Sequence, residues 1–404
     1  METLRDVELW SVWFEDFFAR IAGLFGRVEP RLTARAYLRA LLGPVERKNG
    51  WQIAAYLGDR TPDRVQVFLR RMAWSADGLR DRVREFAVEY LGDPLAVLVL
   101  DETAVLKKGR MSVGVAPQYA GITGQVENCQ VAVFAAYVTA KSRALVDREL
   151  YLGKTWAGDV ARCRQAGVPT TRGKDVVTKP ELGRRMVERA WRARTPFAWV
   201  AADSLYGQDR RLRAALERRR KGYVLAVPCD ETTFTDVGEM RVDTLAARTP
   251  LVFERRSCGK GAKGERYYDW AVTEVTWPSE AGPARKGWRH LLLVRRSIAD
   301  PTKLAYFAVH ASAGTTMAAL VRVAGLRWAI EDLFETAKTD CGLDQYEVRT
   351  WDAWHRHATL AMAALAFLQV TATRAAHLPA PRESAEPAAE TTPAITPPPT
   401  HRHS

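Results

Sequence analysis

Five short apolar runs between residues 96 and 228 most constrain how this chain can fold. Each run contains β-branched residues and has the length of a buried strand rather than of a helix. The runs are AVLVLD (96–101), CQVAVFAAYV (129–138), ALVDRELYL (144–152), FAWVAAD (197–203) and YVLAVP (223–228). Helical patterns separate the last three runs, so the sequence predicts an α/β domain built on a largely buried sheet.

The remaining segments have different patterns. Before the first run, apolar residues such as Trp10, Phe14 and Phe17 recur at three- and four-residue steps, which predicts helices. The last 29 residues hold seven prolines and cannot bury enough apolar surface to become ordered. We therefore predict a helical domain (1–92), the first part of the α/β domain (93–228), a β-rich insertion of hairpins (229–312), the C-terminal helices of the α/β domain (313–375) and a disordered tail (376–404).

The charge balance favours a polyanionic partner. There are 60 Lys and Arg against 47 Asp and Glu, a formal net charge of +13, which suits nucleic acid or an anionic membrane surface. The apolar stretch at 358–368 is too short to span a bilayer. Five scattered cysteines without a CxxC pair predict a reduced, intracellular protein. No GKS/T loop or GxGxxG is present, so we expect no nucleotide cofactor.

Residues 51–73 have the pattern of a helix-turn-helix pair. Thr61 suits an N-cap and Pro62 the first position of the second helix. That helix would present basic side chains to DNA. The same pattern is common in plain helical bundles, so a purely structural role stays open. The candidate DNA contacts are Arg64, Arg70 and Arg71.

Two of the apolar runs end in an aspartate, Asp101 and Asp203. Ligands in α/β folds are commonly held where strands end. Two carboxylates on neighbouring strands can hold a divalent cation through hard oxygen ligands. A turn or a helix cap is the alternative role for each aspartate taken alone.

A third carboxylate, Glu331, lies in the predicted helix 326–339. Arg327, Glu331 and Lys338 share a face beside the apolar stripe of this helix. The alternative is a solvated face with ion pairs between residues four apart. Three carboxylates beside a basic surface suit phosphoryl transfer on a nucleic acid, in which two Mg²⁺ ions about 3.5–4 Å apart activate the attacking oxygen and stabilise the leaving one.

The chain resembles DDE transposases of bacterial insertion sequences, in particular the insertion sequence 701 family, which is related to the insertion sequence 4 group. The resemblance covers about residues 40–370 and implies an α/β fold, with a ribonuclease H-like catalytic domain that carries a β-rich insertion and follows an all-helical N-terminal domain. Its motifs include VLDETAVLKKGRMSVGVAPQYAG (99–121), ENCQVAVFAAYV (127–138), LVDRELYLGKTW (145–156), TKPELGRRMVERA (178–190), WVAADSLYGQDRRLRAAL (199–216) and YVLAVPCD (223–230).

The resemblance also implies roles for particular residues. Asp101, Asp203 and Glu331 match the catalytic carboxylates that bind Mg²⁺, for which Mn²⁺ is a possible substitute. Arg327, Glu331 and Lys338 match the spacing of the group's Tyr-Arg-Glu-Lys signature, whose Tyr position is Ala324 here. Arg327 and Lys338 are therefore expected to contact DNA.

The basic segment LKKGRMSVG (106–114) follows Asp101 closely. Lys107, Lys108 and Arg110 could hold DNA phosphates at the catalytic mouth, and a solvated basic hairpin is the alternative.

The expected function is a DNA transposase that binds terminal inverted repeats, cleaves the ends by metal-dependent hydrolysis and joins the 3′-OH to target DNA. Its partner would be double-stranded DNA, both transposon ends and target, bound by a homodimer in the synaptic complex and without a membrane. The protein would be cytoplasmic in a bacterium and nucleoid-associated when bound to DNA. Two alternatives stay open: a catalytically inactive or domesticated DNA-binding regulator, and an RNA-directed nuclease of the same fold.

Overall fold

The computed structural model describes residues 4–172, 175–236, 238–261, 264–282 and 284–377. The described N-terminal segment is helical throughout: α1 (Leu4–Ala22), α2 (Val28–Leu42), α3 (Gly50–Tyr56), α4 (Asp63–Arg70) and α5 (Ala76–Leu91). All but the first two residues of the predicted disordered tail (376–404) lie outside the described residues.

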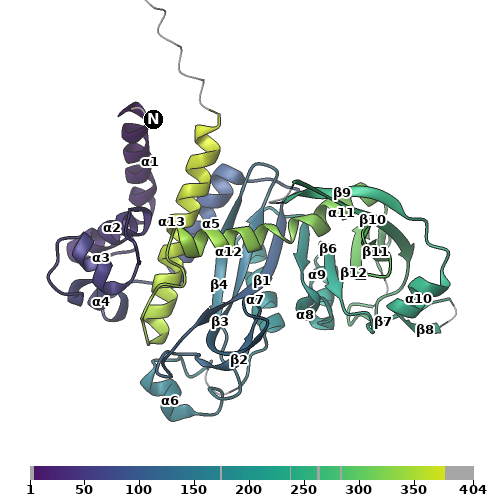
Figure 1. The fold of residues 1–404 in the computed structure, drawn as a ribbon, viewed down its shortest axis with the longest axis horizontal. Helices are drawn as coiled ribbons and strands as arrows, with labels where there is room; N and C mark the ends of the chain where they lie inside the picture. The colour runs from purple at the N-terminus through teal and green to yellow at the C-terminus, as the bar shows by residue number, and fades with distance from the viewer. Residues whose placement is uncertain (1–3, 173–174, 237, 262–263, 283, 378–404) are drawn as a thin grey trace, which may run out of the picture.

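The N-terminal helices pack against the long C-terminal helix α13 (Trp351–Ala375), which lies beside them in Figure 1. The ring centroid of Phe367 on α13 lies 5.6 Å from that of Trp10 and 5.7 Å from that of Phe17. Buried side chains of α1–α5 belong to the same apolar core as those of the sheet. A domain boundary at residue 92 therefore stays a prediction.

The described residues include one mixed sheet of ten strands, in the order β2-β3-β1-β5-β6-β12-β11-β10-β9, with β4 paired to β3. All five apolar runs are strands of this sheet, and β1, β5 and β6 run parallel. The architecture is consistent with a ribonuclease H-like domain. The strands are β1 (Val97–Leu106), β2 (Ala116–Ala120), β3 (Gln125–Val138), β4 (Arg143–Leu150), β5 (Trp199–Ala202), β6 (Gly222–Val227), β9 (Glu254–Gly261), β10 (Gly264–Glu274), β11 (Trp288–Arg296) and β12 (Leu304–Ser312).

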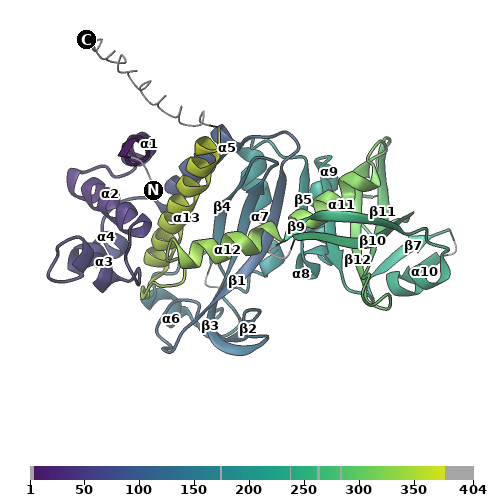
Figure 2. The same cartoon turned by 45° about the horizontal axis from the view of Figure 1, so that its top comes forward.

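The β-rich segment continues the main sheet. β12 pairs antiparallel with β6, with Ala308 opposite Leu225, so this pairing protects an apolar strand that would otherwise be an exposed edge. The segment also holds the small hairpin of β7 (Thr232–Thr235) and β8 (Gly238–Arg241) and a helix that the sequence did not predict, α10 (Val242–Arg248). This end of the molecule lies opposite the N-terminal helices (Figure 2).

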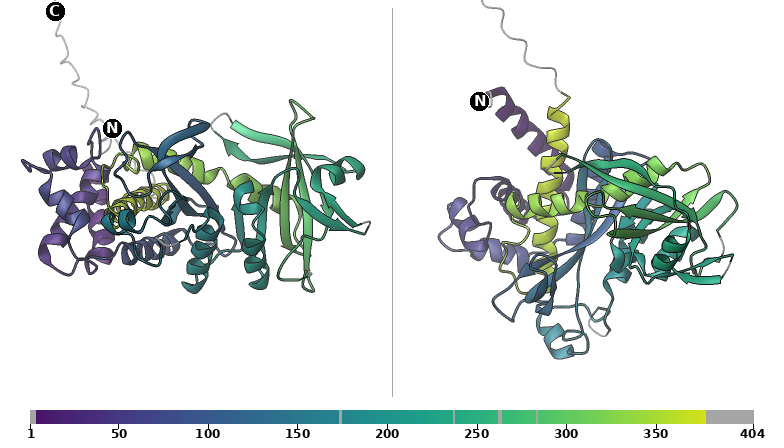
Figure 3. Two further views of the ribbon diagram at one scale, coloured as in Figure 1. Left: turned by 90° about the horizontal axis from the view of Figure 1, so that it is seen from below. Right: turned by 45° about the vertical axis from the view of Figure 1, so that its right-hand side comes forward.

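Helices cover both faces of the central strands (Figure 3). The other helices are α6 (Val160–Gln165), α7 (Lys179–Arg192), α8 (Ser204–Gly207), α9 (Arg210–Arg218), α11 (Met317–Leu326) and α12 (Ala329–Thr339). The predicted helix 326–339 therefore begins later, at Ala329, and Arg327 and Trp328 form the junction between α11 and α12. α11 packs so closely on β9 that a Cβ at Gly325 would lie 1.9 Å from the carbonyl oxygen of Cys258, and the chain turns two residues later.

Among the described residues, α13 has the length and composition needed to cross a membrane. The sequence prediction considered only its central stretch, 358–368, and so underestimated the apolar length. Of the most apolar 18-residue window of α13, 67% is buried inside the protein. This burial is the property of a core helix.

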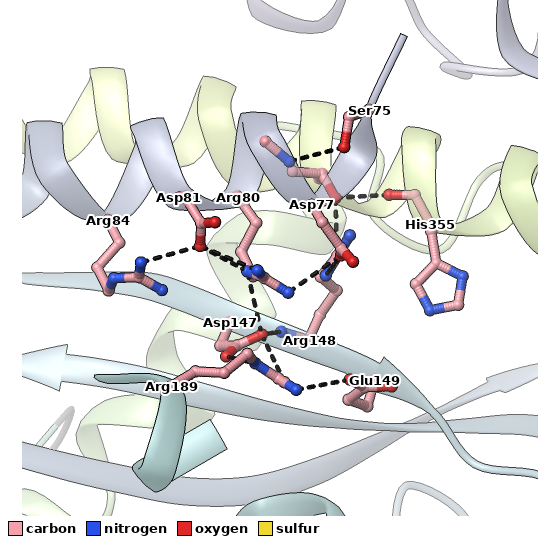
Figure 4. Close-up of polar contacts among 12 residues, drawn as sticks. Ser75, Asp77, Arg80, Asp81, Arg84, Asp147, Arg148, Glu149, Arg189 and His355 are labelled. Carbon is pink, nitrogen blue, oxygen red and sulfur yellow. Dashed lines mark hydrogen bonds and ion pairs between the residues drawn. The ribbon is translucent and has the colours of Figure 1, made fainter. Parts of the chain in front are cut away.

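A buried network of charges joins α5 to the sheet (Figure 4). Asp147 on β4 accepts hydrogen bonds from Arg189 on α7, at 2.8 Å from Nε and 3.0 Å from Nη2. Arg148, whose side chain is 1% exposed, donates from Nη1 to Asp77 on α5 at 2.9 Å. Arg80, also on α5, places Nε 3.8 Å from Asp147. Because buried charges need partners, these contacts fix the position of α5 on β4.

Candidate active site

Asp101 and Asp203 lie side by side on neighbouring strands. β1 and β5 pair in parallel with Leu100 opposite Ala202; Asp101 is the next residue of β1, and Asp203 directly follows the end of β5. Asp203 also caps α8, because its Oδ1 accepts the backbone N–H of Leu205 at 3.0 Å. Asp203 is therefore a helix cap, which was its alternative role, and it also lies beside Asp101.

The prediction that the first strand ends at Asp101 was wrong. β1 continues to Leu106, because it pairs with β3 along its whole length. Asp101 is therefore in the middle of β1, at the level where the shorter β5 has ended. Its side chain points to one face of the sheet, the face on which Nη1 of Arg327 lies 3.6 Å from Oδ2.

The two aspartates share a poorly solvated environment. Burial, together with the negative charge of Asp203, raises the pKa of Asp101 to about 7. Burial and the charge of Glu102 also raise the pKa of Asp203. Perturbed carboxyl pairs of this kind are typical of functional sites, where a proton or a cation relieves their repulsion.

Glu331 is held beside these residues by Arg327. Nη1 of Arg327 lies 3.0 Å from Oε1 of Glu331 and 3.6 Å from Oδ2 of Asp101. The side chain of Arg327 is 19% exposed, whereas that of Glu331 is 51% exposed. The alternative for this helix face was an ion pair between residues four apart, and the pair between Arg327 and Glu331 is such an ion pair. It lies next to Asp101 rather than on a remote surface.

The three predicted carboxylates do not form a complete metal site in this structure. Within the described part of the chain, no group of three or more His, Cys, Asp or Glu side chains could hold a metal ion in this arrangement. Arg327 contacts two of the three predicted ligands. Asp101 and Asp203 alone form a fitting pair, because their hard oxygens suit Mg²⁺ and a cation would stabilise their ionised forms. Burial disfavours these forms and so raises the pKa of each carboxyl group.

Glu102 is a neighbour of the site whose side chain lies on the other face of β1. Its carboxylate accepts hydrogen bonds from the hydroxyl of Tyr206 at 2.6 Å and from Nζ of Lys179 at 2.7 Å. Successive strand residues point to opposite faces, so Glu102 meets α7 and α8 while Asp101 meets Arg327. The position of Glu102 next to Asp101 in the sequence indicated that it lies near the site. Nothing in the sequence indicated its contacts with Lys179 and Tyr206.

The predicted DNA contacts on α4 are at the surface. Arg64, Arg70 and Arg71 are all exposed, and Arg64 forms an ion pair with Asp59 at 2.8 Å. The predicted capping was wrong: α4 begins at Asp63, and the hydroxyl of Thr61 donates to the Asp63 side chain at 2.8 Å.

The predicted contacts near the catalytic mouth divide into two kinds. Lys108 and Arg110 are exposed in the loop between β1 and β2. Lys107 turns inward and donates from Nζ to the carbonyl of Tyr346 at 2.8 Å, and burial lowers its pKa to about 8. Lys338 also donates inward, to the carbonyl of Ala104 at 3.4 Å. In this structure Lys107 and Lys338 each hydrogen-bond a backbone carbonyl of a segment distant in the sequence.

Comparison with known proteins identifies the family of the chain. Residues 20–292, more than half of the chain, match the model of the DDE superfamily endonucleases, and the chain belongs to this family. It is also similar to the probable transposase for insertion sequence element IS701 of Microchaete diplosiphon, with 25% identity over 229 residues, 56% of this chain and 54% of that protein. The chain thus spans about half the length of this curated relative.

These matches confirm the resemblance drawn from the sequence motifs. The segment matched to the family includes Asp101 and Asp203 and ends before Glu331. The case for Glu331 therefore depends on its position beside Arg327.

Proposed function

We propose that the protein is a metal-dependent DNA transposase with a ribonuclease H-like catalytic domain. The proposal is carried by Asp101 and Asp203, which lie together on adjacent parallel strands, with Arg327 joining Glu331 to them. Membership of the DDE endonucleases supports cleavage of a phosphodiester, and the similarity to a transposase supports DNA as the substrate. The net charge of +13 suits a polyanion.

Asp101 and Asp203 would hold Mg²⁺, or Mn²⁺ in its place, and Glu331 would join them after leaving Arg327. When bound, the metal would activate the attacking oxygen and stabilise the leaving one. Arg327 would then be free to hold a phosphate oxygen, for which its planar guanidinium is well suited. In this proposal, Arg327 supplies positive charge beside the carboxylates until DNA and the metal ion bind.

The reaction would proceed in two displacements at phosphorus. Water attacks the phosphodiester at the transposon end, and the 3′-oxygen leaves as a free 3′-OH beside a 5′-phosphate. That 3′-OH then attacks a target phosphodiester, whose own 3′-oxygen leaves. The second displacement breaks one phosphodiester and forms another, so it requires no nucleotide cofactor.

The partners follow from this chemistry. Two ends must be processed together, so we propose at least a homodimer on DNA, in the cytoplasm of a bacterium and associated with its nucleoid. The β-rich segment would support the transposon end, because it extends the sheet that carries Asp203.

The test uses labelled duplexes taken from the DNA that flanks the coding sequence. With Mg²⁺, the wild-type protein should nick them. Asp203→Asn should bind them normally but cut at least about 100-fold more slowly, because losing only an outer-shell partner of a metal ligand already costs about 10–100-fold. Asp16→Asn, an exposed change on α1, is the control. Full activity of Asp203→Asn would disprove the site assignment.

One observation favours a second function, a catalytically inactive DNA-binding regulator. Arg327 already engages Asp101 and Glu331, and a permanent ion pair would prevent metal binding. Salt-sensitive DNA binding by the wild type, without nicking in Mg²⁺ or Mn²⁺, would support this function.

A further inference from the structure

A groove with a volume of about 660 Å³ lies between the helix pair α3–α4 and the sheet-containing part of the molecule. Trp51 on α3 and Arg70 on α4 line one side. Arg110 and Met111, from the loop between β1 and β2, and Arg349, from the segment before α13, line the other. We call this the α3–α4 groove. It joins two segments that the sequence analysis considered separately, the helix pair and the basic loop.

Three of the arginines that line the α3–α4 groove are exposed and have no acidic partner among the described residues. Within the described residues, Arg70, Arg110 and Arg349 form no ion pair, in contrast to the arginines of the buried network. Glu347 is the acidic residue among the described residues that line the groove. Unpaired guanidinium groups gathered along one groove create a positive potential that attracts a polyanion.

Apolar side chains lie among these charges. Trp51 is 59% exposed and Met111 is 62% exposed. Exposed aromatic rings next to arginine are typical of nucleic-acid sites, where they pack on sugars or bases while the cations hold phosphates. A small anionic ligand would make no use of these apolar surfaces.

The distance from Asp101 to the α3–α4 groove can be estimated from the length of β1 and expressed as a number of base pairs. β1 runs five residues from Asp101 to Leu106, or about 17 Å at the usual rise of a strand. The next residue, Lys107, places Nζ 3.8 Å from the ring centroid of Tyr346, which lines the groove. The groove thus begins roughly 20 Å from Asp101, a separation of about six base pairs in a duplex.

We propose that the α3–α4 groove binds the sugar–phosphate backbone of the duplex whose phosphodiester lies at Asp101, about six base pairs from that bond. The identity of this duplex rests on the proposed function, but binding in the groove requires neither metal nor cleavage. Arg110 and Arg349 contact phosphates, and Trp51 packs against a sugar or base.

The first experiment measures binding of the full chain to a flanking duplex in EDTA, over a range of salt concentrations. Arg110→Gln/Arg349→Gln should bind about 10-fold more weakly, with a salt slope lower by about two, since each lost phosphate contact removes about one. Arg194→Gln/Arg220→Gln removes the same charge elsewhere, at two exposed arginines that form no ion pair within the described residues and lie before β5 and β6, outside the proposed DNA-binding segments. Equal weakening by both pairs would overturn the proposal.

Trp51→Ala separates the apolar contact from general electrostatics. It should weaken binding about five-fold, consistent with a lost stacking contact, and leave the salt slope unchanged. An unchanged affinity would remove Trp51 from the contact surface and overturn that part of the proposal.

The second experiment maps the contacted phosphates by ethylation interference, again in EDTA. The wild type should show interference about six base pairs from the bond that it cuts in Mg²⁺, and the Arg110/Arg349 variant should lose that signal alone. An identical pattern for both proteins would exclude the groove. If the wild type does not cut at all, the proposed function fails, and the binding difference between the paired variants still decides whether the groove contacts DNA.

Discussion

Nη1 of Arg327 lies 3.6 Å from Oδ2 of Asp101, although the two residues come from opposite halves of the chain. The contact forms because the junction between α11 and α12 lies over β1 where β5 has ended. Arg327 partly offsets the negative charges of Asp101 and Asp203, which burial would otherwise leave in mutual repulsion.

We expect Arg327→Gln to lower the free energy of unfolding in EDTA by about 1–3 kcal/mol, because it removes a charged partner from a partly buried carboxylate. Mg²⁺ should restore more stability to this variant than to the wild type, since the ion would replace the lost charge. Denaturant unfolding with and without Mg²⁺ measures both effects. Arg322→Gln, an exposed change on α11, is the control, and equal behaviour of the two variants would contradict the charge-balancing role.

Asp147→Asn should destabilise the protein strongly. The change leaves Arg189 and Arg80 beside a neutral group in a buried network, and breaking such a pair costs about 3–5 kcal/mol. Glu85→Gln breaks an ion pair with Arg82 in which both side chains are more than half exposed, and should cost at most about 1 kcal/mol. Urea unfolding of the two variants compares them, and similar losses would show that the network contributes no more than a surface pair.

The two neighbouring lysines after β1 should differ in their effect on DNA binding. Lys108→Gln removes an exposed charge and should weaken binding and lower the salt slope by about one. Lys107→Met should leave affinity within about two-fold, since its ammonium is already engaged with Tyr346 and contributes little to the exposed charge. Salt-dependent binding in EDTA gives both slopes. Equal slopes for the two variants would show that Lys107 also reaches the phosphates.

The lowered pKa of Glu217 on α9 leads us to expect that part of the stability of the fold is lost in acid. Burial opposes its ionisation, but hydrogen bonds outweigh burial and lower its pKa from 4.5 to about 2. A carboxyl whose pKa is lower in the folded state stabilises the fold above its unfolded pKa and loses that contribution as the pH falls towards about 2. Ser279 and Tyr223 donate hydrogen bonds to this carboxylate, and Nε2 of His290 lies 3.4 Å from its Oε1.

Glu217→Gln should therefore be less stable than the wild type by roughly 3 kcal/mol at pH 6, and the difference should shrink at pH 3. Denaturant unfolding at the two pH values tests this. Glu274→Gln, whose side chain is 70% exposed, is the control. A difference between Glu217→Gln and the wild type that did not change with pH would contradict the role of ionised Glu217.

The local patterns of the sequence were enough to predict five strands of the main sheet, and they indicated Asp101 and Asp203 as candidate site residues. Alternation and β-branched content identify a buried strand wherever it pairs, so all five apolar runs are strands. Aspartates that follow two such runs indicated a shared site, because parallel strands bring equivalent ends together.

The tertiary structure decided what these elements contact. The length of β1 depends on pairing with β3, and the break at Arg327 follows close packing at Gly325. The engagement of Lys107 and the α3–α4 groove also depend on segments distant in the chain. Side-chain periodicity records which face of an element is buried, but not which distant surface buries it.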